Sequence, residues 1–544
     1  MEDEPKKSAV TVDDIDYEVG QDNIQVFGLD IHNPVFAISG GVVVVFVVLT
    51  LLFPVTTEEF FSWLRPWLTD NFDWFLMIAG NLFVLFSLAL IVTPLGSIRL
   101  GGADATPDYS YLGWFSMLFA AGMGIGLMYF GVSEPLGHYQ AAIGGVSVEN
   151  GVRTDWAPLG GAEGDAAAAQ SLAMAATIYH WGLHPWAIYA VVALSLAFFS
   201  YNRGLPLTLR SVFYPLLGER VWGWPGHIID TLAVFATLFG LATSLGFGAE
   251  QAMAGIEFLF GIPATDGNKV ILIILITAIA LVSVVAGLDA GVKRLSEINM
   301  ALALVLLVFI LLAGPTLVIV TGFFQNTASY VTYLLPLANP FGREDVNFLH
   351  GWTTFYWAWW ISWSPFVGMF IARVSRGRTV REFVTCVLIV PTILSIIWMS
   401  TFGGTAIEQV ASATNALVAE VSDDLKLFIM ANALPLTQIV SFLGIVLVII
   451  FFVTSSDSGS LVIDTITAGG KVDAPTAQRV FWATFEGLVA ITLLLSGGLA
   501  ALQSAAVATG LPFAVLLILM MVSTWQGLRG ERYVTTPPAM APGQ

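Results

Sequence analysis

Residues 351–372 read GWTTFYWAWWISWSPFVGMFIA, and this stretch decides the fold. The twenty residues from 353 onward carry no charged side chain, and a helix of that length crosses about 30 Å of hydrocarbon. The first thirteen positions hold five tryptophans and a tyrosine. On a helix, one face would carry a continuous aromatic stripe of Trp352, Tyr356, Trp360 and Trp363.

Two interpretations of this aromatic cluster are open. Tryptophan gathers where membrane helices meet the lipid headgroups, so the cluster is typical of an interfacial anchor. The cluster also extends to the middle of the span, however. Aromatic faces there would hold a quaternary ammonium group, each ring contributing roughly 0.5–2 kcal/mol. A second aromatic set at residues 181–189 favours this cage.

The composition indicates a polytopic membrane protein. The chain has 544 residues, of which 56% are hydrophobic and 11% charged, and its mean hydropathy is +0.80. Soluble globular proteins carry about a quarter charged residues. Because twelve apolar stretches are long enough to span a bilayer, we expect an all-α fold of twelve transmembrane helices. The stretches lie near residues 34–54, 74–95, 111–131, 172–199, 229–249, 270–288, 299–323, 353–372, 385–403, 436–455, 480–497 and 508–527.

The distribution of basic residues predicts the orientation. With the N-terminus inside the cell, the cytoplasmic segments hold sixteen Lys and Arg residues and the outer segments hold five. Cytoplasmic loops of membrane proteins carry this excess. We therefore expect a multi-pass protein of the cell membrane with both termini in the cytoplasm. These termini are an acidic tail, residues 1–33, and a short tail, residues 529–544, and no cleavable signal sequence is recognised.

The net charge of −18 is acidic for a membrane protein. Acids lie in the outer loops, for example at Glu163 and Asp424, as well as in the N-terminal tail. Dense carboxylates keep proteins soluble in concentrated salt, so this surface favours a halophile. The alternative is a neutral-salt bacterium with acidic loops. No basic strip for nucleic acid is recognised, and the single cysteine, Cys386, excludes an intramolecular disulfide.

Glycines interrupt the third stretch at Gly122, Gly124 and Gly126. Each destabilises a helix by about 1 kcal/mol. The setting is apolar and no strand precedes the glycines, so a dinucleotide-binding loop is excluded. They form either a small-residue face for helix packing or a span unwound at the membrane midplane, where free backbone groups bind ions and substrate.

The fourth stretch carries His180-Trp-Gly-Leu-His-Pro-Trp-Ala-Ile-Tyr189. Pro185 donates no hydrogen bond and would free the carbonyl of Trp181. Trp181, Trp186 and Tyr189 would share one face of the helix. The two histidines have a spacing that suits zinc, but the glutamate of a HExxH motif and a third ligand are missing, so no metal site is expected there.

The tenth stretch ends in FFVTSSDS, residues 451–458. Hydroxyls within a helix usually bond to the carbonyl four residues earlier. Hydroxyls and freed carbonyls are also the ligands that a hard cation such as Na⁺ prefers, and Thr237, Thr243 and Ser244 in the fifth stretch offer the same chemistry. Because no paired acids inside the spans, nucleophile elbow or phosphate loop are recognised, an enzyme is not expected.

Taken together, these segments resemble the betaine/carnitine/choline transporter (BCCT) family over roughly residues 30–528. Four motifs in their expected order carry the resemblance: AAGMGIGLMYFGVSEP, HWGLHPWAIY, GWTTFYWAWWISWSPFVGMFIARVSRGRTVREF and FFVTSSDSGS. The resemblance implies a LeuT-like core of two inverted five-helix repeats, preceded by two extra transmembrane helices in residues 34–110. The repeats would be residues 111–323 and 351–528, joined by an outer amphipathic segment, residues 324–350.

The resemblance also implies the binding residues. An aromatic box for a trimethylammonium head would consist of Trp181, Trp186, Tyr189, Trp359, Trp360 and Trp363. The substrate carboxylate would lie at the backbone of Gly122, Gly124 and Gly126. A first Na⁺ site would correspond to Ala120, Met123, Phe451, Thr454 and Ser455. A second would correspond to Thr237 and Phe366, but Leu241 stands where the family has another hydroxyl, which puts that site in doubt.

The function implied is import of glycine betaine or a related trimethylammonium compatible solute, coupled to Na⁺, by alternating access. The alternatives are a sodium-independent carnitine-type exchanger, a proton-coupled choline importer, and a receptor that binds such a ligand without moving it. Members of the family form trimers through an amphipathic helix, which Ala328–Asn339 would provide. The expected partners are therefore membrane lipids and further copies of this chain, with no cofactor besides the coupling ion.

Overall fold

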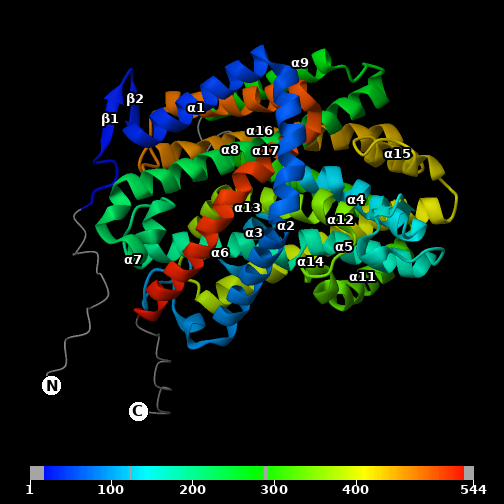
Figure 1. Cartoon of the computed structure of the whole chain (residues 1–544), viewed down its shortest axis with the longest axis horizontal. Helices are drawn as coiled ribbons and strands as arrows, with labels where there is room; N and C mark the ends of the chain where they lie inside the picture. Colours follow the sequence, from blue (N-terminus) through cyan, green and yellow to red (C-terminus); the bar gives the residue numbers. More distant parts are fainter. Residues whose placement is uncertain (1–16, 123, 287–291, 532–544) are drawn as a thin grey trace, which may run out of the picture.

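The computed structural model describes residues 17–122, 124–286 and 292–531, and this part of the chain is mostly helical (Figure 1). The strands in it form two short antiparallel hairpins outside the long helices. They are β1 (Asn23–Val26) with β2 (Leu29–His32) and β3 (Val148–Glu149) with β4 (Val152–Arg153). The expected class, an all-α polytopic membrane protein, is confirmed.

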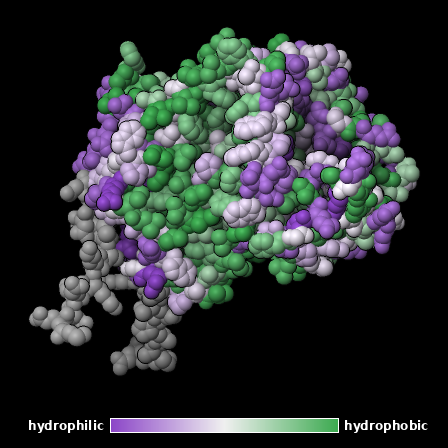
Figure 2. Space-filling model, in the orientation of Figure 1, coloured by the Kyte–Doolittle hydropathy of each residue, from purple (hydrophilic) through white to green (hydrophobic). Residues whose placement is uncertain are grey.

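Nine helical segments in the described part are long and apolar enough to cross a membrane. They are α1 (Asn33–Leu52), α2 (Pro54–Val92), α5 with α6 (Ala166–Trp181 and Leu183–Tyr201), α8 (Trp224–Phe260), α9 (Asp266–Ala286), α10 (Val292–Ala313), α14 (Val380–Ala411), α16 (Thr437–Thr467) and α17 (Thr476–Arg529). Figure 2 shows a broad hydrophobic area over the helices, with hydrophilic residues gathered toward its left and right ends. This arrangement suits a protein whose middle lies in lipid and whose two ends lie in water.

The third expected span consists of two helices, α3 (Tyr111–Gly122) and α4 (Ile125–Gly144). Extended backbone at Gly124, with φ −170° and ψ −175°, separates them. The first N–H groups of a helix have no partner within it, so this break presents backbone donors to the interior. Irregular backbone at membrane depth persists only where it is buried in protein or lines a cavity.

A second break lies at Gly182, between α5 and α6. Its φ of −102° and ψ of −130° leave the helix, and a Cβ on this residue would meet the Ile178 carbonyl oxygen at 2.6 Å. The sequence predicted only a carbonyl freed by Pro185. The structure instead interrupts the helix completely, so Trp181 and Trp186 belong to two different helices.

The seventh expected span ends earlier than the hydropathy pattern suggested. Helix α10 stops at Ala313, and α11 (Thr316–Ala338) begins after Gly314 and Pro315. The prediction of one apolar helix to residue 323 is therefore wrong, because proline has no N–H and its ring clashes with the preceding turn. The predicted amphipathic helix, Ala328–Asn339, coincides with the second half of α11.

The aromatic-rich stretch begins with α12 (Val346–Phe348) and a π-helix, η6 (Leu349–Thr354), and continues as α13 (Phe355–Arg373). π-helical turns are frequent at functional sites. The described residues also form seven further short helices: η2 (Pro94–Ser97), η3 (Pro158–Gly160), η4 (Arg210–Phe213), α7 (Tyr214–Leu217), η5 (Gly218–Trp222), η7 (Ala416–Ala419) and α15 (Lys426–Asn432).

Both ends of the described chain lie at one end of the molecule. The Tyr17 ring stacks on Trp222 with centroids 3.9 Å apart, and Glu531 forms a 3.2 Å ion pair with Arg203. The same end carries Arg99, Arg203, Arg376 and Arg378, because the backbone of residues 98–101 is hydrogen-bonded to residues 377–380 and to Asn202. We call these four arginines and their loops the basic end.

The opposite end is built from loops that pack onto the start of the aromatic stretch. The Asp155 carboxylate accepts hydrogen bonds from Arg153 Nε and Nη2 at 3.0 and 2.6 Å, and these bonds lower the pKa of the Asp155 carboxyl. The neighbouring Trp156 ring lies against Gly351, where a Cβ would come within 2.2 Å of it. The outer loop therefore covers η6 directly.

The packing of α17 on α13 provides the first test. A Cβ at Gly510 would meet the Ala358 carbonyl oxygen at 2.4 Å. We expect Gly510→Ala to destabilise the protein by about 1–3 kcal/mol, the usual cost of overpacking, measured as a lower melting temperature in detergent. Gly404→Ala in α14 is the matched control, because no described atom lies within 4 Å of its added methyl group. Equal melting temperatures for the two variants would contradict the close approach.

Candidate binding site

The six residues predicted to form an aromatic box line one small cavity of about 40 Å³ in the structure. Trp181 ends α5, Trp186 and Tyr189 lie in the first turns of α6, and Trp359, Trp360 and Trp363 lie on α13. Gly124 and Gly126 of the broken third span line the same cavity. Gly122 ends α3. The two helix breaks thus meet at the aromatic cluster, which we call the cage.

Trp360 is the centre of the cage. Its ring stacks on Trp359 with centroids 4.7 Å apart and an interplanar angle of 17°, and it meets Trp181 edge to face at 4.9 Å. Tyr189 meets Trp360 at 6.1 Å from the other side of the break. The Trp360 indole N–H donates a 2.9 Å hydrogen bond to the His180 carbonyl. The interrupted helix is therefore held by the cage itself.

Gly126 gives two rings of the cage their room. A Cβ at this position would lie 2.7 Å from the Trp181 ring and 3.1 Å from the Trp359 ring. Gly126 and Gly124 also flank the first residue of α4, whose N-terminal N–H groups and positive dipole end favour an anion. One cavity thus combines aromatic faces for a cation with a helix N-terminus for a carboxylate.

A second, larger cavity of about 1070 Å³ adjoins the cage. Trp363 lines both cavities. Five of the seven residues predicted to bind Na⁺ line the larger cavity: Ala120, Phe451, Thr454, Ser455 and Phe366. The Thr454 hydroxyl donates a 3.0 Å hydrogen bond to the Ile450 carbonyl. This is the bond to the carbonyl four residues earlier that is expected of a hydroxyl within a helix. Met123 lies outside the described residues.

The second predicted Na⁺ site is less polar. The Thr237 hydroxyl donates a 2.7 Å hydrogen bond to the Ala233 carbonyl on its own helix. Leu241 is fully buried and packs so tightly on α16 that a Cβ at Gly459 would come within 2.1 Å of it. Thr243 is directed toward α17 instead, because its hydroxyl donates a 2.9 Å hydrogen bond to the Leu502 carbonyl.

The larger cavity extends toward the basic end. It is lined by Phe115 near the start of α3 and by Phe370 near the end of α13. Both helix ends belong to the basic end, since α13 finishes at Arg373 and the Arg378 guanidinium lies 4.3 Å from the centre of the Tyr111 ring. The other side of the cage is packed instead with four buried aromatic rings, those of Phe130, Phe247, Phe355 and Tyr356.

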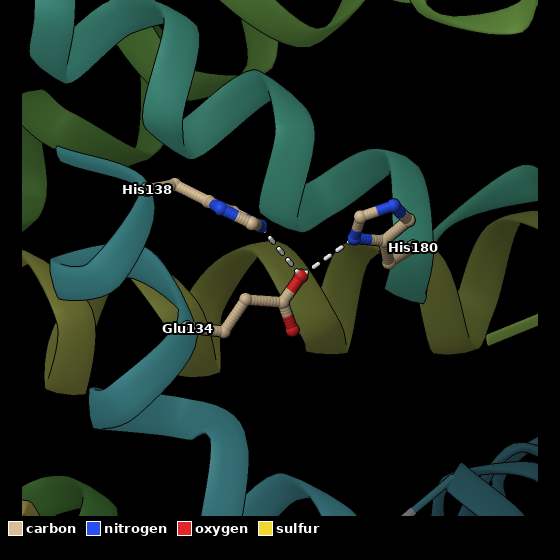
Figure 3. A group of neighbouring side chains, drawn as sticks. All are labelled: Glu134, His138 and His180. Atoms are coloured by element: carbon tan, nitrogen blue, oxygen red, sulfur yellow. Dashed lines mark hydrogen bonds and ion pairs between the residues drawn. The ribbon is translucent and has the colours of Figure 1, made fainter. Parts of the chain in front are cut away.

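Sequence reasoning missed a buried acid behind the cage. Glu134 of α4 lies within hydrogen-bond distance of His138 and His180, and the three form a group with metal-ligand geometry (Figure 3). An acid inside a span is a functional candidate by default, but Glu134 lies three residues beyond the expected third stretch, 111–131, whereas α4 continues to Gly144. No metal site was expected from the spacing of His180 and His184, and His184 lies apart from this group and contacts Asn81 at 3.0 Å.

Two further buried acids correct the statement that the spans lack paired acids. Asp457 of α16 accepts a 2.6 Å hydrogen bond from Ser283, and Glu486 of α17 accepts 2.8 Å from Ser456. Both side chains are almost completely buried. They lie on neighbouring helices but are 29 residues apart in the sequence, which is why no local pattern revealed the pair.

Two broken helices around an aromatic cage, with a cavity that extends from the cage toward one end of a polytopic membrane protein, are typical of membrane transport proteins. The pattern of the "BCCT, betaine/carnitine/choline family transporter" matches residues 34–533. The chain belongs to this family, as the sequence motifs predicted, and its members are named transporters rather than enzymes.

Curated relatives cover most of the chain. A glycine betaine/proline/choline transporter of Vibrio parahaemolyticus is 64% identical over 96% of this chain and 95% of its own. A glycine betaine/proline/choline/ectoine transporter of the same organism is 53% identical, over 96% and 91%. The glycine betaine transporter OpuD of Bacillus subtilis is 42% identical, over 86% and 89%.

The cage geometry predicts the effect of removing its walls. We expect Trp363→Ala and Trp186→Ala each to raise the half-saturation concentration for glycine betaine, by up to roughly thirtyfold, because each would remove one aromatic face of the predicted cation cage. The measurement is uptake into proteoliposomes with equal amounts of inserted protein. Trp63→Ala on α2 is the control, since that ring is 59% exposed. Unchanged half-saturation in both cage variants would contradict the assignment.

Proposed function

We propose that this protein is a secondary active transporter that imports glycine betaine or a related quaternary ammonium solute together with Na⁺. The observation that carries the proposal is the cage, in which Trp359, Trp360 and Trp181 pack around a cavity that also contains the N-terminus of α4. Glycine betaine has a trimethylammonium group and a carboxylate, which match these two kinds of surface. The names of the relatives, which print glycine betaine, proline, choline and ectoine, support the same substrate class.

We propose twelve transmembrane helices arranged as two extra helices and two inverted repeats of five. Nine spans in the described part of the chain are long and apolar enough to be recognised directly. The other three are the broken pair α3–α4, the aromatic helix α13, and the second half of α17. The last follows from Gly497 and Gly498, whose backbone leaves the helix at φ 159° and 63°. In this arrangement α3–α4 and α13 open the two repeats, at residues 111 and 351, and both contribute to the cage.

The orientation we propose places the basic end in the cytoplasm. The four arginines of that end agree with the usual charge bias of membrane proteins, and both described chain ends lie there. The cavity that extends from the cage toward this end is then the path by which substrate and ion are released. The conformation fits the inward-facing state of an alternating-access cycle, with the aromatic packing on the outer side acting as the closed gate.

The acidic surface fits a cell that experiences high salt. The net charge of −18 supports solubility in concentrated salt, and a compatible solute is what such a cell accumulates.

Helix α11 lies outside the nine apolar spans and carries exposed apolar side chains such as Leu317, Phe324 and Val331. We propose that it forms the contact between copies in a homotrimer, surrounded by membrane lipids.

One experiment separates this proposal from its alternatives. Purified protein in proteoliposomes would be given labelled glycine betaine under a Na⁺ gradient, a proton gradient, or neither. Uptake that requires Na⁺ supports the proposal. Uptake of choline driven by protons would favour the choline importer, and exchange without any gradient would favour the carnitine-type exchanger. Binding without uptake under any gradient would favour the receptor.

The sodium sites predict different effects for two threonines. Thr454 lines the cavity with Ser455 and Phe451, whereas Thr237 faces the buried, apolar Leu241 region. We expect Thr454→Ala to raise the half-saturation for Na⁺ by about tenfold or more, because an ion that loses one ligand in low dielectric keeps its desolvation cost. Thr237→Ala should have a milder effect, and the Hill coefficient for Na⁺ should be about one if a single site is coupled.

The control for Thr454→Ala is Thr465→Ala. Thr465 lies on the same helix, is buried, and makes the same type of bond, 2.8 Å to the Leu461 carbonyl. The single-site proposal would be contradicted by a Hill coefficient for Na⁺ of about two. It would also be contradicted if Thr454→Ala and Thr237→Ala raised the half-saturation for Na⁺ equally.

A further inference from the structure

We propose that Glu134 is a positioning residue that holds the walls of the cage and supplies the negative charge behind them. The inference rests on the proposed function and deepens it, since it names the group that tunes the cage for a cation. Glu134 lies on α4, eight residues after Gly126, and its side chain is fully buried. Its carboxylate points away from the cavity into the ring cluster that backs the cage.

One oxygen of Glu134 is shared by two aromatic side chains. Oε2 accepts a 2.8 Å hydrogen bond from the Trp181 indole N–H and a 2.5 Å hydrogen bond from the Tyr356 hydroxyl. The indole N–H is a donor with no acceptor capacity, so its ring can take this orientation only while an acceptor stands there. Trp181 is a wall of the cage, and Tyr356 packs on both Trp181 and Trp360, at centroid distances of 5.6 and 5.7 Å.

The other oxygen is held by two imidazoles. Oε1 lies 2.7 Å from His180 Nδ1 and 3.2 Å from His138 Nε2 (Figure 3). The opposite nitrogen of His180, Nε2, lies 2.9 Å from the Thr353 hydroxyl, and the His180 carbonyl accepts the hydrogen bond from Trp360. Glu134 therefore fixes Trp181 directly and Trp360 through His180, at the end of α5 that precedes the break at Gly182.

The same contacts give the carboxylate an electrostatic role. Hydrogen bonds to an ionised acceptor are shorter and stronger than neutral ones, and four donors or ring nitrogens converge on these two oxygens. A carboxylate that accepts the indole N–H pushes electron density toward the ring, and the attraction between a cation and a ring depends on that density. In a dry site the negative charge also acts over a longer distance than in water. Both effects favour a quaternary ammonium group on the far side of Trp181.

A metal ion is the competing interpretation of Glu134, His138 and His180, whose ligand atoms lie within 4.8 Å of one another. The separation of 2.7 Å between Oε1 and His180 Nδ1 is that of a direct hydrogen bond. Oε2 is already occupied by Trp181 and Tyr356. The positioning role accounts for all four contacts, so it is the one we adopt, and the metal becomes an outcome of the test.

The experiment compares Glu134→Gln and Glu134→Ala with wild-type protein in proteoliposomes under a saturating Na⁺ gradient. The glutamine keeps one acceptor but loses the charge, so we expect the half-saturation for glycine betaine to rise about fivefold to tenfold with a maximal rate within about twofold. The alanine loses both the acceptor and the charge, so we expect the half-saturation for glycine betaine to rise about thirtyfold or more. A merely structural role would lower the maximal rate and the melting temperature instead. Unchanged half-saturation in Glu134→Gln would overturn the proposal.

His184→Gln is the matched control. His184 is buried beside the same helix break, but its hydrogen bond goes to Asn81 rather than to the cage. We expect its half-saturation to stay within about twofold of wild type, since no ring of the cage depends on it. Zn²⁺ or a chelator would also be added to the wild-type protein and to Glu134→Gln. If either addition changes the half-saturation for glycine betaine in the wild type but not in the variant, the positioning role is overturned in favour of a metal site.

A ligand-free measurement separates this inference from the proposed function. Protein labelled with 5-fluorotryptophan would give a ¹⁹F resonance for Trp181, assigned by its loss in Trp181→Phe. We expect that resonance to move in Glu134→Gln, and an identical spectrum would overturn the positioning role. A wild-type protein that neither binds nor transports glycine betaine would contradict the proposed function, while the ¹⁹F shift would still decide whether Glu134 holds Trp181.

Discussion

The hydrogen bond from the Trp360 indole to the His180 carbonyl is the interaction on which the centre of this protein depends. A membrane offers no water to a broken helix, so every carbonyl and N–H released at Gly182 must find a partner in the protein or a cavity. The cage supplies that partner. The aromatic residues that would bind the substrate are therefore also the residues that make the interruption of α5 and α6 tolerable, and the site cannot be altered independently of the fold.

Local pattern in the sequence predicted much of this arrangement. The stripe of aromatic residues at positions 352–363 and the glycines at 122–126 are short-range features, and one cavity brings most of these residues together. The order and approximate position of the apolar helices followed from hydropathy alone. The family assignment rested on the same motifs and was confirmed.

The features that the sequence did not reveal depend on contacts between distant segments. Glu134 is joined to Tyr356 across 222 residues, and no single-sequence rule connects two such positions. The sequence predicted less than the full break at Gly182, because a nearby proline was enough to explain a kink. The structure adds a distant partner for the released backbone, since the Leu183 N–H donates a 3.1 Å hydrogen bond to the Tyr330 hydroxyl. The end of α10 at Ala313 was missed because hydropathy is insensitive to the backbone chemistry of Gly314 and Pro315.

The large cavity beneath the cage also has an electrical consequence. Where water and salt fill a cavity, the electrical potential inside it stays close to that of the solution with which it is continuous. The membrane voltage then falls mainly across the dry layer between the cavity and the opposite end of the protein. Moving one elementary charge through a full drop of 100 mV changes its energy by about 2.3 kcal/mol. In the inward-facing orientation we propose, that drop would be concentrated in the ring-filled layer around the buried Phe130, Phe247 and Tyr356. A cation crossing only this thin layer would experience most of the driving force that the whole bilayer provides.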